Sequence, residues 1–403
     1  MFWKNWKKLE KSLPCDLETD FFMPKDMGVG SDKKALFEKC AYAYACITAT
    51  ANAIASLGVK LEREEGGVWV SATEEAEDIG AKSLIRYPCG KKPTPPQLSW
   101  HDLTVQGISN LLIFGRAYLL PQFVERNSRI YKVLPLLDGQ VQVENNKEGY
   151  PESYIIGGKA FPPTKIIHAQ TISPFDFSGG LGAIKPAVQA IQTDLIASRR
   201  VKANLQNKAA VGLILRLKGV FTAGEEQRKK ILENLRENYQ AASQDGTPFV
   251  VSDQVETELL ENKTVDYQTI RELSKKEILA AFQTPPPVIG DYEAATLNNF
   301  HEAFKIWWLI RLFPLANAFF SAINTQAFWP TYGDKYRLWY DLEGSEIALL
   351  LKKDRAEYAK TLVDMGFPAN LAAKDAGLDL PEVEGLSEPL QNLAVAGRIN
   401  ENG

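Results

Sequence analysis

Histidine, cysteine and acidic side chains most often build catalytic or metal sites, and this sequence offers few of them in a useful arrangement. Its three histidines are His101, His168 and His301, and none has a second histidine or a cysteine at metal-ligand spacing. The four cysteines form no CxxC pair, and neither a GxSxG nor an HExxH motif occurs. The residue spacing therefore predicts no catalytic residues, no metal site and no cofactor.

Two glycine-rich stretches were compared with phosphate-binding loops, because backbone amides at a helix start can hold a phosphate. The stretch "SGGLGAIK" precedes an expected helix but lacks the GxxxxGK[ST] pattern, and "YPCGKKPT" has GK without the flanking residues. Both stretches are therefore interpreted as turns, and we expect no nucleotide hydrolysis.

The segment "TPPPVIGDYEAATLNNF", residues 284 to 300, lies between two expected helices. Its three consecutive prolines are expected to exclude regular structure at its start, and Gly290 permits a bend before the polar residues that follow. The pattern predicts a stiff loop with a polar tip.

Composition limits the function further. The 403 residues are 45% hydrophobic, which is ordinary for a globular protein of two or three domains. A net charge of −4 argues against binding nucleic acid through overall positive charge, since neutralising phosphates requires clustered Lys and Arg. The lysine- and tryptophan-containing N-terminus has no signal-peptide run and is interpreted as a solvated arm, with contact to a partner or a membrane surface as alternatives.

A stretch at 306 to 323, "IWWLIRLFPLANAFFSAI", approaches the length of a membrane span. Arg311 near its middle would be costly in a bilayer, and Pro314 follows it. We therefore expect a core helix.

The remaining periodicity predicts a mixed α+β chain. Helices are expected over 34–57, 101–118, 183–208, 223–243, 267–283 and 346–376. Short strands are expected in a hairpin around Gly66 and Gly67, in four pieces between 131 and 170, and in a strand and hairpin between 210 and 261. The 183–208 helix carries Ile184, Val188 and Ile191 on one face.

Several stretches, in this order, resemble phage portal proteins of the HK97 type. The stretches are "AYACITATANAIASLGVKLE", "LLIFGRAYLLP", "KIIHAQTISPFDFSGGLGAIKPAVQAIQ", "DYQTIRELSKKEILAAFQTPPPVIGDYEAATLNNFHEAF" and "TLVDMGFPANLAAKDAGLDLPEVEG". Together they cover about residues 34 to 385. The sequence departs from the family pattern at Thr284, which stands before Pro285 to Pro287 in place of Val-Pro-Pro, and at Asn370 and Lys374.

The resemblance implies a portal fold with an α/β wing, a two-helix stem, an inserted α/β clip, a long kinked helix and a helical crown. The implied ranges are an N-terminal arm 1–29, wing 30–178, stem helix 179–208, clip 209–265, second stem helix 266–283, tunnel loop 284–299, wing again 300–344, and crown with tail 345–403.

The resemblance also implies which residues matter. The tunnel loop would line a DNA channel with Gly290, Asp291, Tyr292, Glu293, Ala294, Ala295, Thr296, Asn298 and Asn299. The stem would contact a neighbouring subunit or the channel through Arg199, Arg200, Lys202, Glu272 and Glu277. A mildly acidic subunit suits a channel through which DNA must slide, because each basic contact to phosphate would retard it.

The implied function is that of a non-enzymatic ring of twelve subunits at one capsid vertex of a virion, assembled in the host cytoplasm. Its partners would be double-stranded DNA, the terminase large subunit, a head–tail adaptor, and the major capsid protein or scaffold, with no membrane. Two alternatives stay open: a nucleic-acid-processing enzyme with a dispersed site, for instance around His168 and Asp176, and a membrane-anchored assembly factor using helix 306–323.

Overall fold

The computed structural model describes residues 32–90, 98–124, 129–206, 213–217, 255–259, 266–292 and 297–378. The chain divides into two compact units, one of residues 1–45 with 183–282 and one of residues 46–182 with 283–403.

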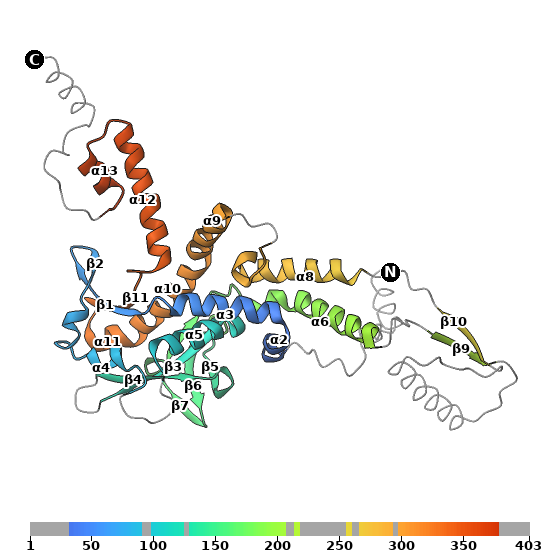
Figure 1. The fold of residues 1–403 in the computed structure, drawn as a ribbon. Helices are drawn as coiled ribbons and strands as arrows, with labels where there is room; N and C mark the ends of the chain where they lie inside the picture. The colour runs from blue at the N-terminus through green and yellow to red at the C-terminus, as the bar shows by residue number, and fades with distance from the viewer. Residues whose placement is uncertain are drawn as a thin grey trace, which may run out of the picture. The chain divides into compact units, whose positions relative to one another are not determined.

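The first unit is built on two long helices, α6 (Ile184–Gln206) and α8 (Tyr267–Phe282), which lie side by side and run antiparallel (Figure 1). Between them in sequence, β9 (Leu213–Leu217) pairs antiparallel with β10 (Val255–Leu259). The predicted helix 223–243 lies outside the described residues.

The N-terminal helix predicted over 34–57 is wrong as a single element, because it is two helices. The first, α2 (Lys33–Lys39), starts after Asp32, whose side chain accepts a hydrogen bond from the Lys34 amide at 3.1 Å. Cys40 then adopts an extended conformation, with φ −99° and ψ 109°, and α3 (Ala41–Ala55) begins. Helical periodicity runs across this break, so the sequence pattern does not reveal it.

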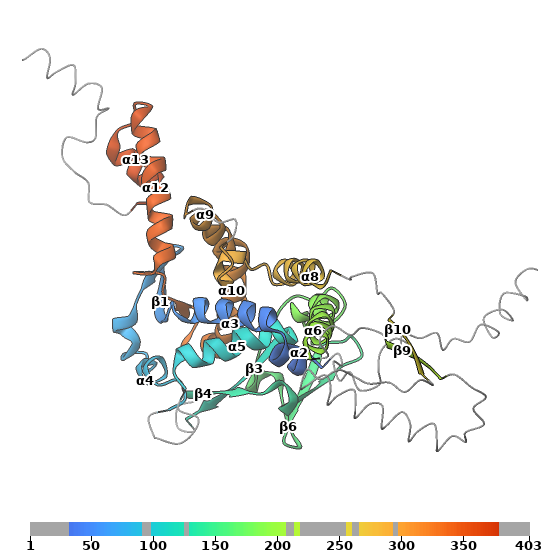
Figure 2. The same ribbon diagram turned by 45° about the vertical axis from the view of Figure 1, so that its right-hand side comes forward.

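In the described part of the chain, the strands form small antiparallel sheets of two or three strands each (Figure 2). In the second unit, the hairpin of β1 (Val59–Glu65) and β2 (Val68–Ser71) turns at the predicted glycine pair, and β11 (Tyr336–Tyr340) pairs with the other edge of β1. The other two sheets of this unit have the strand orders β4-β3-β8 and β5-β6-β7. Their strands are β3 (Arg116–Phe123), β4 (Ile130–Leu136), β8 (Ile167–Gln170), β5 (Val141–Asn145), β6 (Pro151–Ile156) and β7 (Lys159–Phe161).

Helix α5 (Trp100–Phe114) is shorter than the predicted 101–118. Ser99 and Asp102 form a reciprocal capping box at its start, and Gly115 ends it at φ 85°. A Cβ on Gly115 would lie 2.5 Å from the Leu181 amide nitrogen, so only glycine fits here. The residues after this cap belong to β3, because the left-handed cap turns the chain into the sheet.

The aromatic helix is continuous in path but changes pitch twice. Its parts are α9 (Leu297–Trp307), η6 (Trp308–Leu312), α10 (Phe313–Ile323), η7 (Asn324–Phe328) and α11 (Trp329–Tyr332), of which η6 and η7 are π-helical. A proline stands two residues after the end of each π turn, at Pro314 and Pro330, in the first turn of the α-helix that follows. Asn324 is buried, donates to the carbonyls of Phe320 and Leu338 and accepts from the Leu338 amide, and so fastens the helix to β11.

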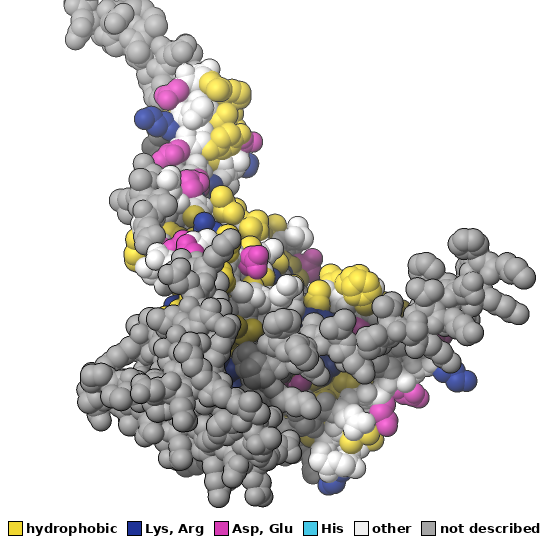
Figure 3. All heavy atoms as spheres, turned by 90° about the vertical axis from the view of Figure 1, so that its right-hand side faces the viewer, with side chains coloured by type: hydrophobic (Ala, Val, Ile, Leu, Met, Phe, Trp, Pro, Cys, Tyr) yellow, Lys and Arg dark blue, Asp and Glu magenta, His cyan; other side chains and the backbone are white. Residues whose placement is uncertain are grey.

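Two helices, α12 (Glu346–Asp364) and α13 (Ala369–Asp375), form the last described part of the second unit. They pack on each other through Ala359, Ala372 and Ala376. Figure 3 shows hydrophobic side chains along one side of this helical column. Exposed apolar residues of the two helices and their connection include Leu349, Met365, Phe367 and Leu371.

Five short helices complete the described elements: η2 (Thr73–Ala76), α4 (Lys82–Arg86), η3 (Asp138–Gln140), η4 (Pro163–Lys165) and η5 (Pro286–Ile289).

Candidate channel and subunit-contact residues

The loop after α8 is stiffened by its backbone. Gln283 is the one non-glycine residue with positive φ, at 53°, among the residues that the structure describes, and it ends α8 in the left-handed region. The three prolines do not exclude regular structure, as Pro286 to Ile289 form a single 3-10 turn with Pro285 as its N-cap. Gly290 closes the turn at φ 87°, and its amide donates to the Pro287 carbonyl at 3.2 Å.

The predicted tunnel-loop residues are only partly covered. Gly290 has no atom within 4 Å of a Cβ built on it, Asp291 is half-buried, and Tyr292 is exposed. Asn299 is exposed near the start of α9. The remaining predicted residues, Glu293, Ala294, Ala295, Thr296 and the side chain of Asn298, lie outside the described residues.

The predicted charged residues of the two long helices are all exposed. Within the described ranges, Arg199, Arg200 and Lys202 form no ion pair, and Glu272 accepts only a hydrogen bond, from Gln268 at 3.0 Å. In the antiparallel pair, the arginines and Glu277 lie on opposite sides of the level at which Asp194 meets Arg271. At 1.5 Å per residue this separates them by about 16 Å along the axis. Within one chain, the arginines therefore lie too far from Glu277 to form an ion pair with it.

Sequence reasoning missed the pair that does join the helices. The Arg271 Nε on α8 donates to Asp194 Oδ1 on α6 at 3.0 Å, and the Asp194 side chain is buried. The thiol of Cys40 lies in the same environment, where desolvation is the largest cause of its raised pKa. Asp194 lies three residues after Ile191 on the buried face of α6, so a charged residue on an apolar stripe was the available signal.

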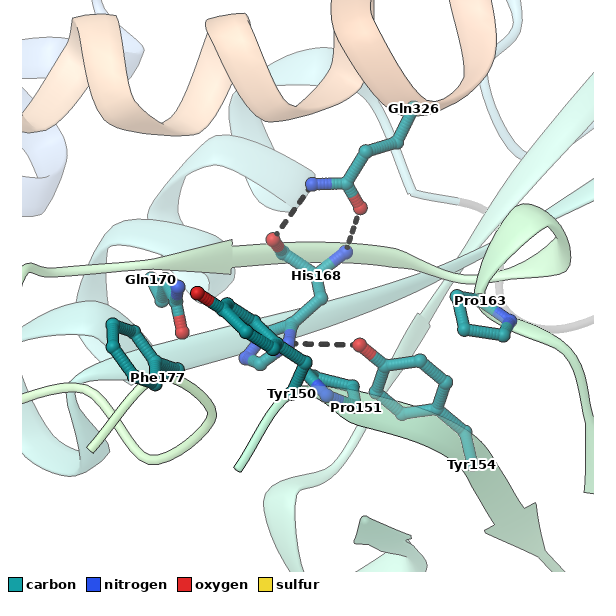
Figure 4. Close-up of a pocket in the computed structure, with 8 residues that line it drawn as sticks. All are labelled: Tyr150, Pro151, Tyr154, Pro163, His168, Gln170, Phe177 and Gln326. Atoms are coloured by element: carbon teal, nitrogen blue, oxygen red, sulfur yellow. Dashed lines mark hydrogen bonds between the residues drawn. The ribbon is translucent and has the colours of Figure 1, made fainter. Parts of the chain in front are cut away.

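The second unit contains a pocket of about 330 Å³ around His168 (Figure 4). Burial lowers the pKa of His168 to about 4, so the imidazole is neutral near pH 7. Its Nδ1 lies 3.0 Å from Tyr154 Oη. Burial also raises the pKa of Tyr154 to about 12, so this hydroxyl keeps its proton.

Gln326, on η7, holds the backbone of His168 from the side of the helix. Its Oε1 accepts from the His168 amide at 2.7 Å, and its Nε2 donates to the His168 carbonyl at 3.0 Å (Figure 4). The amide side chain thereby completes the open edge of β8, as a neighbouring strand would.

The arrangement around His168 does not form an acid–base pair with Asp176. The Asp176 carboxylate accepts from the Ser178 amide at 2.8 Å, and this hydrogen bond is the largest cause of its lowered pKa. The carboxylate is thus used as a turn cap, while the imidazole is bonded to a tyrosine. In the part of the chain that the structure describes, no group of three or more His, Cys, Asp or Glu residues could hold a metal ion.

The helix Asn299–Tyr332 is long and apolar enough to cross a membrane by length and composition, and half of its most apolar window is buried inside the protein. Trp307, Trp308, Phe319 and Phe320 are almost fully buried. Burial lowers the pKa of Arg311, whose Nε has no hydrogen-bond partner among the described residues. The core packing favours a helix of the globular interior.

Comparisons with known proteins assign the chain to a family. The sequence model of the family described as phage portal protein matches residues 41–369. Uncharacterised proteins of Rickettsia bellii and Rickettsia felis are 23% and 22% identical to the chain, over 94% and 88% of it and 97% and 92% of their own lengths.

Solved structures share the fold. A chain from the neck of an empty gene transfer agent particle, computed with C6 symmetry, is 21% identical, with a TM-score of 0.61 over 89% of this chain and 95% of that one. A chain from the neck of the native particle, computed with C12 symmetry, is 20% identical with a TM-score of 0.58, over 88% and 95%. An HK97-family phage portal protein from Corynebacterium diphtheriae is 14% identical with a TM-score of 0.57, over 79% and 96%. The mixed helix and sheet architecture expected from the sequence is confirmed.

Proposed function

The chain belongs to the phage portal protein family, and we propose that it forms a closed ring at one capsid vertex, through which double-stranded DNA is packaged and released. The family match over most of the chain is the observation that carries the proposal. A neck structure computed with C12 symmetry supports a ring of twelve copies. The ring belongs in the virion, is assembled in the host cytoplasm, and docks the terminase large subunit, a head–tail adaptor and the major capsid protein or scaffold.

The helix pair of the first unit supplies the stem of the proposed ring. Helices α6 and α8 are joined by a segment that contains the β9–β10 pair, as an inserted clip requires. Exposed charges that form no ion pair with another described residue, such as Arg199 and Arg200, suit contact with a neighbouring subunit. A closed ring supplies such a neighbour on both sides of each copy.

The loop after α8 is proposed as the constriction of the channel. Its base is a 3-10 turn with proline at three consecutive positions, Pro285 to Pro287, which reduces the entropy that the loop loses on meeting DNA. Asp291 repels passing phosphates, and asparagine at 298 and 299 offers neutral hydrogen bonds.

The proposed role is structural rather than enzymatic. The His168 imidazole, with its pKa of about 4, is a weak base, and Asp176 is engaged as a turn cap. Incubation with plasmid DNA and Mg²⁺ or Mn²⁺ is expected to leave the DNA intact, and cleavage by purified protein would favour the enzymatic alternative.

Imaging of the purified full-length chain by negative-stain microscopy tests the ring. We expect particles with a central hole and a mass of several subunits by light scattering. A monomeric mass at every concentration, with no rings, contradicts the proposal. Recovery that requires detergent would instead favour the membrane-anchored alternative.

Deletion of residues 291–295 tests the channel loop separately. We expect ring assembly to persist and the amount of nuclease-protected DNA in packaged capsids to fall. A control variant replaces the same five residues with glycine and serine, which keeps the loop length and removes the charge. Loss of folding on deletion would mean that the segment is structural core.

A further inference from the structure

The pocket at His168 opens beside an apolar loop that the proposed function leaves unused. Within residues 171–178, Ile172, Phe175 and Phe177 are 93%, 91% and 57% exposed. Phe177 stacks on Tyr150 with ring centroids 4.8 Å apart, and these two rings form the rim of the pocket (Figure 4). Exposed apolar side chains gathered beside a pocket are typical of a binding surface.

This loop is held in place by hydrogen bonds. Thr171 Oγ1 lies 3.0 Å from the Gly115 carbonyl oxygen and 2.9 Å from the Leu181 carbonyl oxygen, and it donates its one proton to either of them. The same oxygen accepts from the Leu181 amide at 3.1 Å. At the other end, Ser178 Oγ accepts from Asn145 Nδ2 at 2.8 Å. The exposed rings are therefore presented by a fixed backbone, and a partner that binds them pays little for ordering the loop.

The pocket interior lacks one hydrogen-bond partner. His168 is only 7% exposed, and its Nε2 has no partner among the described residues. In the tautomer whose Nδ1–H donates to Tyr154 Oη, Nε2 is an acceptor that an indole N–H satisfies. In the other tautomer, Nε2–H is a donor that a backbone carbonyl satisfies. A peptide segment that carries tryptophan supplies both groups.

The edge of the neighbouring sheet cannot take an added strand at this point, because Gln326 occupies both backbone groups of His168. An occupant must therefore enter by a side chain. The volume of about 330 Å³ is at the small end of ligand pockets, and Pro151 and Pro163 add apolar walls, so one aromatic side chain suits it.

The chain itself contains a segment of matching chemistry. Its first 13 residues, "MFWKNWKKLEKSL", carry Trp3 and Trp6 with four lysines and one glutamate, a net charge of +3 from side chains, whereas residues 14–31 carry a net charge of −3. The positive charge therefore lies beside the two tryptophans. The two segments that border the pocket, 144–152 and 171–178, carry four carboxylates and one lysine, a net charge of −3. Opposite charge around an apolar anchor favours association. An arm of 31 residues spans up to about 100 Å when extended, enough to reach an adjacent molecule.

We propose that the pocket bordered by Tyr150 and Phe177 receives a tryptophan from the N-terminal arm, residues 1–31, of a second copy of the chain. The inference rests on the proposed ring, which places copies beside one another. It adds a contact between the N-terminal arm of one copy and the pocket of the next.

Photo-cross-linking in the full-length chain tests this contact. Benzoylphenylalanine replaces Trp3 in one variant and Trp6 in another, rings are confirmed by microscopy, and the sample is irradiated. We expect a ladder of covalent multimers on a denaturing gel, and peptides of 1–31 joined to peptides of 144–178 by mass spectrometry. The double substitution Tyr150→Ser with Phe177→Ser, at two half-exposed positions, is expected to reduce the multimer yield at least fivefold.

Leu371→Ser, at an exposed apolar position on α13, is the matched control and is expected to leave the yield unchanged. Rings that show no multimer ladder, cross-links confined to one chain, attachment outside 144–178, or a yield insensitive to the rim substitutions would each overturn the inference and leave the ring standing. A chain that forms no rings contradicts the proposed function as well.

Discussion

The helix pair α6–α8 and the aromatic helix from α9 to α11 are each the central element of one unit. The contacts that stabilise these two regions differ. The buried residues of the helix pair are small or aliphatic for the most part, such as Ala187, Ile191 and Ile278, and the ion pair of Asp194 with Arg271 joins the two helices. In the aromatic helix, α10 packs against α5, β8 and β11, and the Phe320 ring contacts the rings of Trp339 and Tyr340 on β11.

The difference teaches which region has surface left for other molecules. Half of the most apolar window of the aromatic helix is buried inside the protein. The helix pair buries a narrow face and keeps most of its described lysines, arginines and glutamates exposed, although Arg271 and Lys275 are half-buried. We therefore expect substitutions in the aromatic helix to change folding, and substitutions on the exposed face of the helix pair to change assembly.

Truncation of Phe319 should give the largest effect. Phe319 is fully buried, and Phe319→Ala is expected to lower the free energy of unfolding by about 3–5 kcal/mol through lost transfer energy and a cavity. Urea unfolding followed by tryptophan fluorescence measures it, because every tryptophan in the described residues lies in the second unit. Leu273→Ala on α8, at a 55% exposed position, is the control and should change stability by less than about 0.5 kcal/mol. Equal losses of stability in Phe319→Ala and Leu273→Ala would contradict the proposed difference between the two regions.

Gly107 gives a second check of the same packing. A Cβ built there lies 2.2 Å from Cε2 of the buried Phe319 ring, so Gly107→Ala is expected to destabilise by about 1–3 kcal/mol, although alanine favours a helix. In combination with Phe319→Ala the added methyl has room, and the two costs should be less than additive. Additive costs in the same urea measurement would show that the ring moves aside.

Acid should weaken the second unit through His168. Its pKa is about 4 in the folded chain against 6.5 for an unperturbed histidine, so the unfolded state binds the proton first as the pH falls. The stabilisation is complete above pH 6.5 and is lost as the pH falls toward 4, by about 3 kcal/mol. Unfolding at pH 7 and at pH 4 measures it, with His168→Gln as the control that lacks this group. An identical pH dependence in the variant would contradict the assignment.

The stability of the helix pair should depend on the buried carboxylate of Asp194. Arg271→Ala leaves the Asp194 carboxylate buried without its partner, and a loss of about 1–2 kcal/mol is expected. Hydrogen exchange of α6 and α8 peptides by mass spectrometry reads this unit directly. The double variant Asp194→Ala with Arg271→Ala should lose less than Arg271→Ala alone, because no uncompensated charge remains.

The sequence predicted much of this architecture because local rules decide it. Alternating residues around Gly66 and Gly67 predicted the β1–β2 hairpin, which the structure confirms. The pairing of Leu61 with Leu338 joins strands far apart in sequence, and a period of two residues does not choose a partner. The assignment to the portal family rested on motifs in the right order, and the family match confirms it.

The site was less predictable, since its residues act through burial and contact. The role of Asp194 was not predicted, because the expected buried face of α6 was defined by its apolar positions alone. The left-handed conformation of Gln283 was not predicted, because glycine is the usual residue at a left-handed helix end. The neutral state of His168 comes from residues that enclose it on three different elements. The proposed roles of Arg199, Arg200 and Lys202 depend on a second molecule, which no single chain contains.

Of the substitutions predicted here, charge reversal on α6 should have the smallest effect on the free energy of unfolding and the largest effect on ring assembly. Arg199→Glu with Arg200→Glu replaces exposed side chains, so the free energy of unfolding should stay within about 0.5 kcal/mol of the starting value. If these arginines face Glu272 and Glu277 of the next copy, two ion pairs become repulsive. A cost near 1.4 kcal/mol then raises the concentration for half-maximal ring formation about tenfold.

The compensating variant decides between the two roles of this surface. Glu272→Arg with Glu277→Arg, combined with the reversal on α6, should restore ring formation if the helices meet across subunits. Lys185→Glu, at an exposed position near the other end of α6, serves as the control for added negative charge. If rings of the reversed variant form at the original concentration while DNA packaging changes, the arginines face the DNA path. Light scattering across a concentration series separates the two outcomes, because only a subunit contact couples these charges to the mass of the ring.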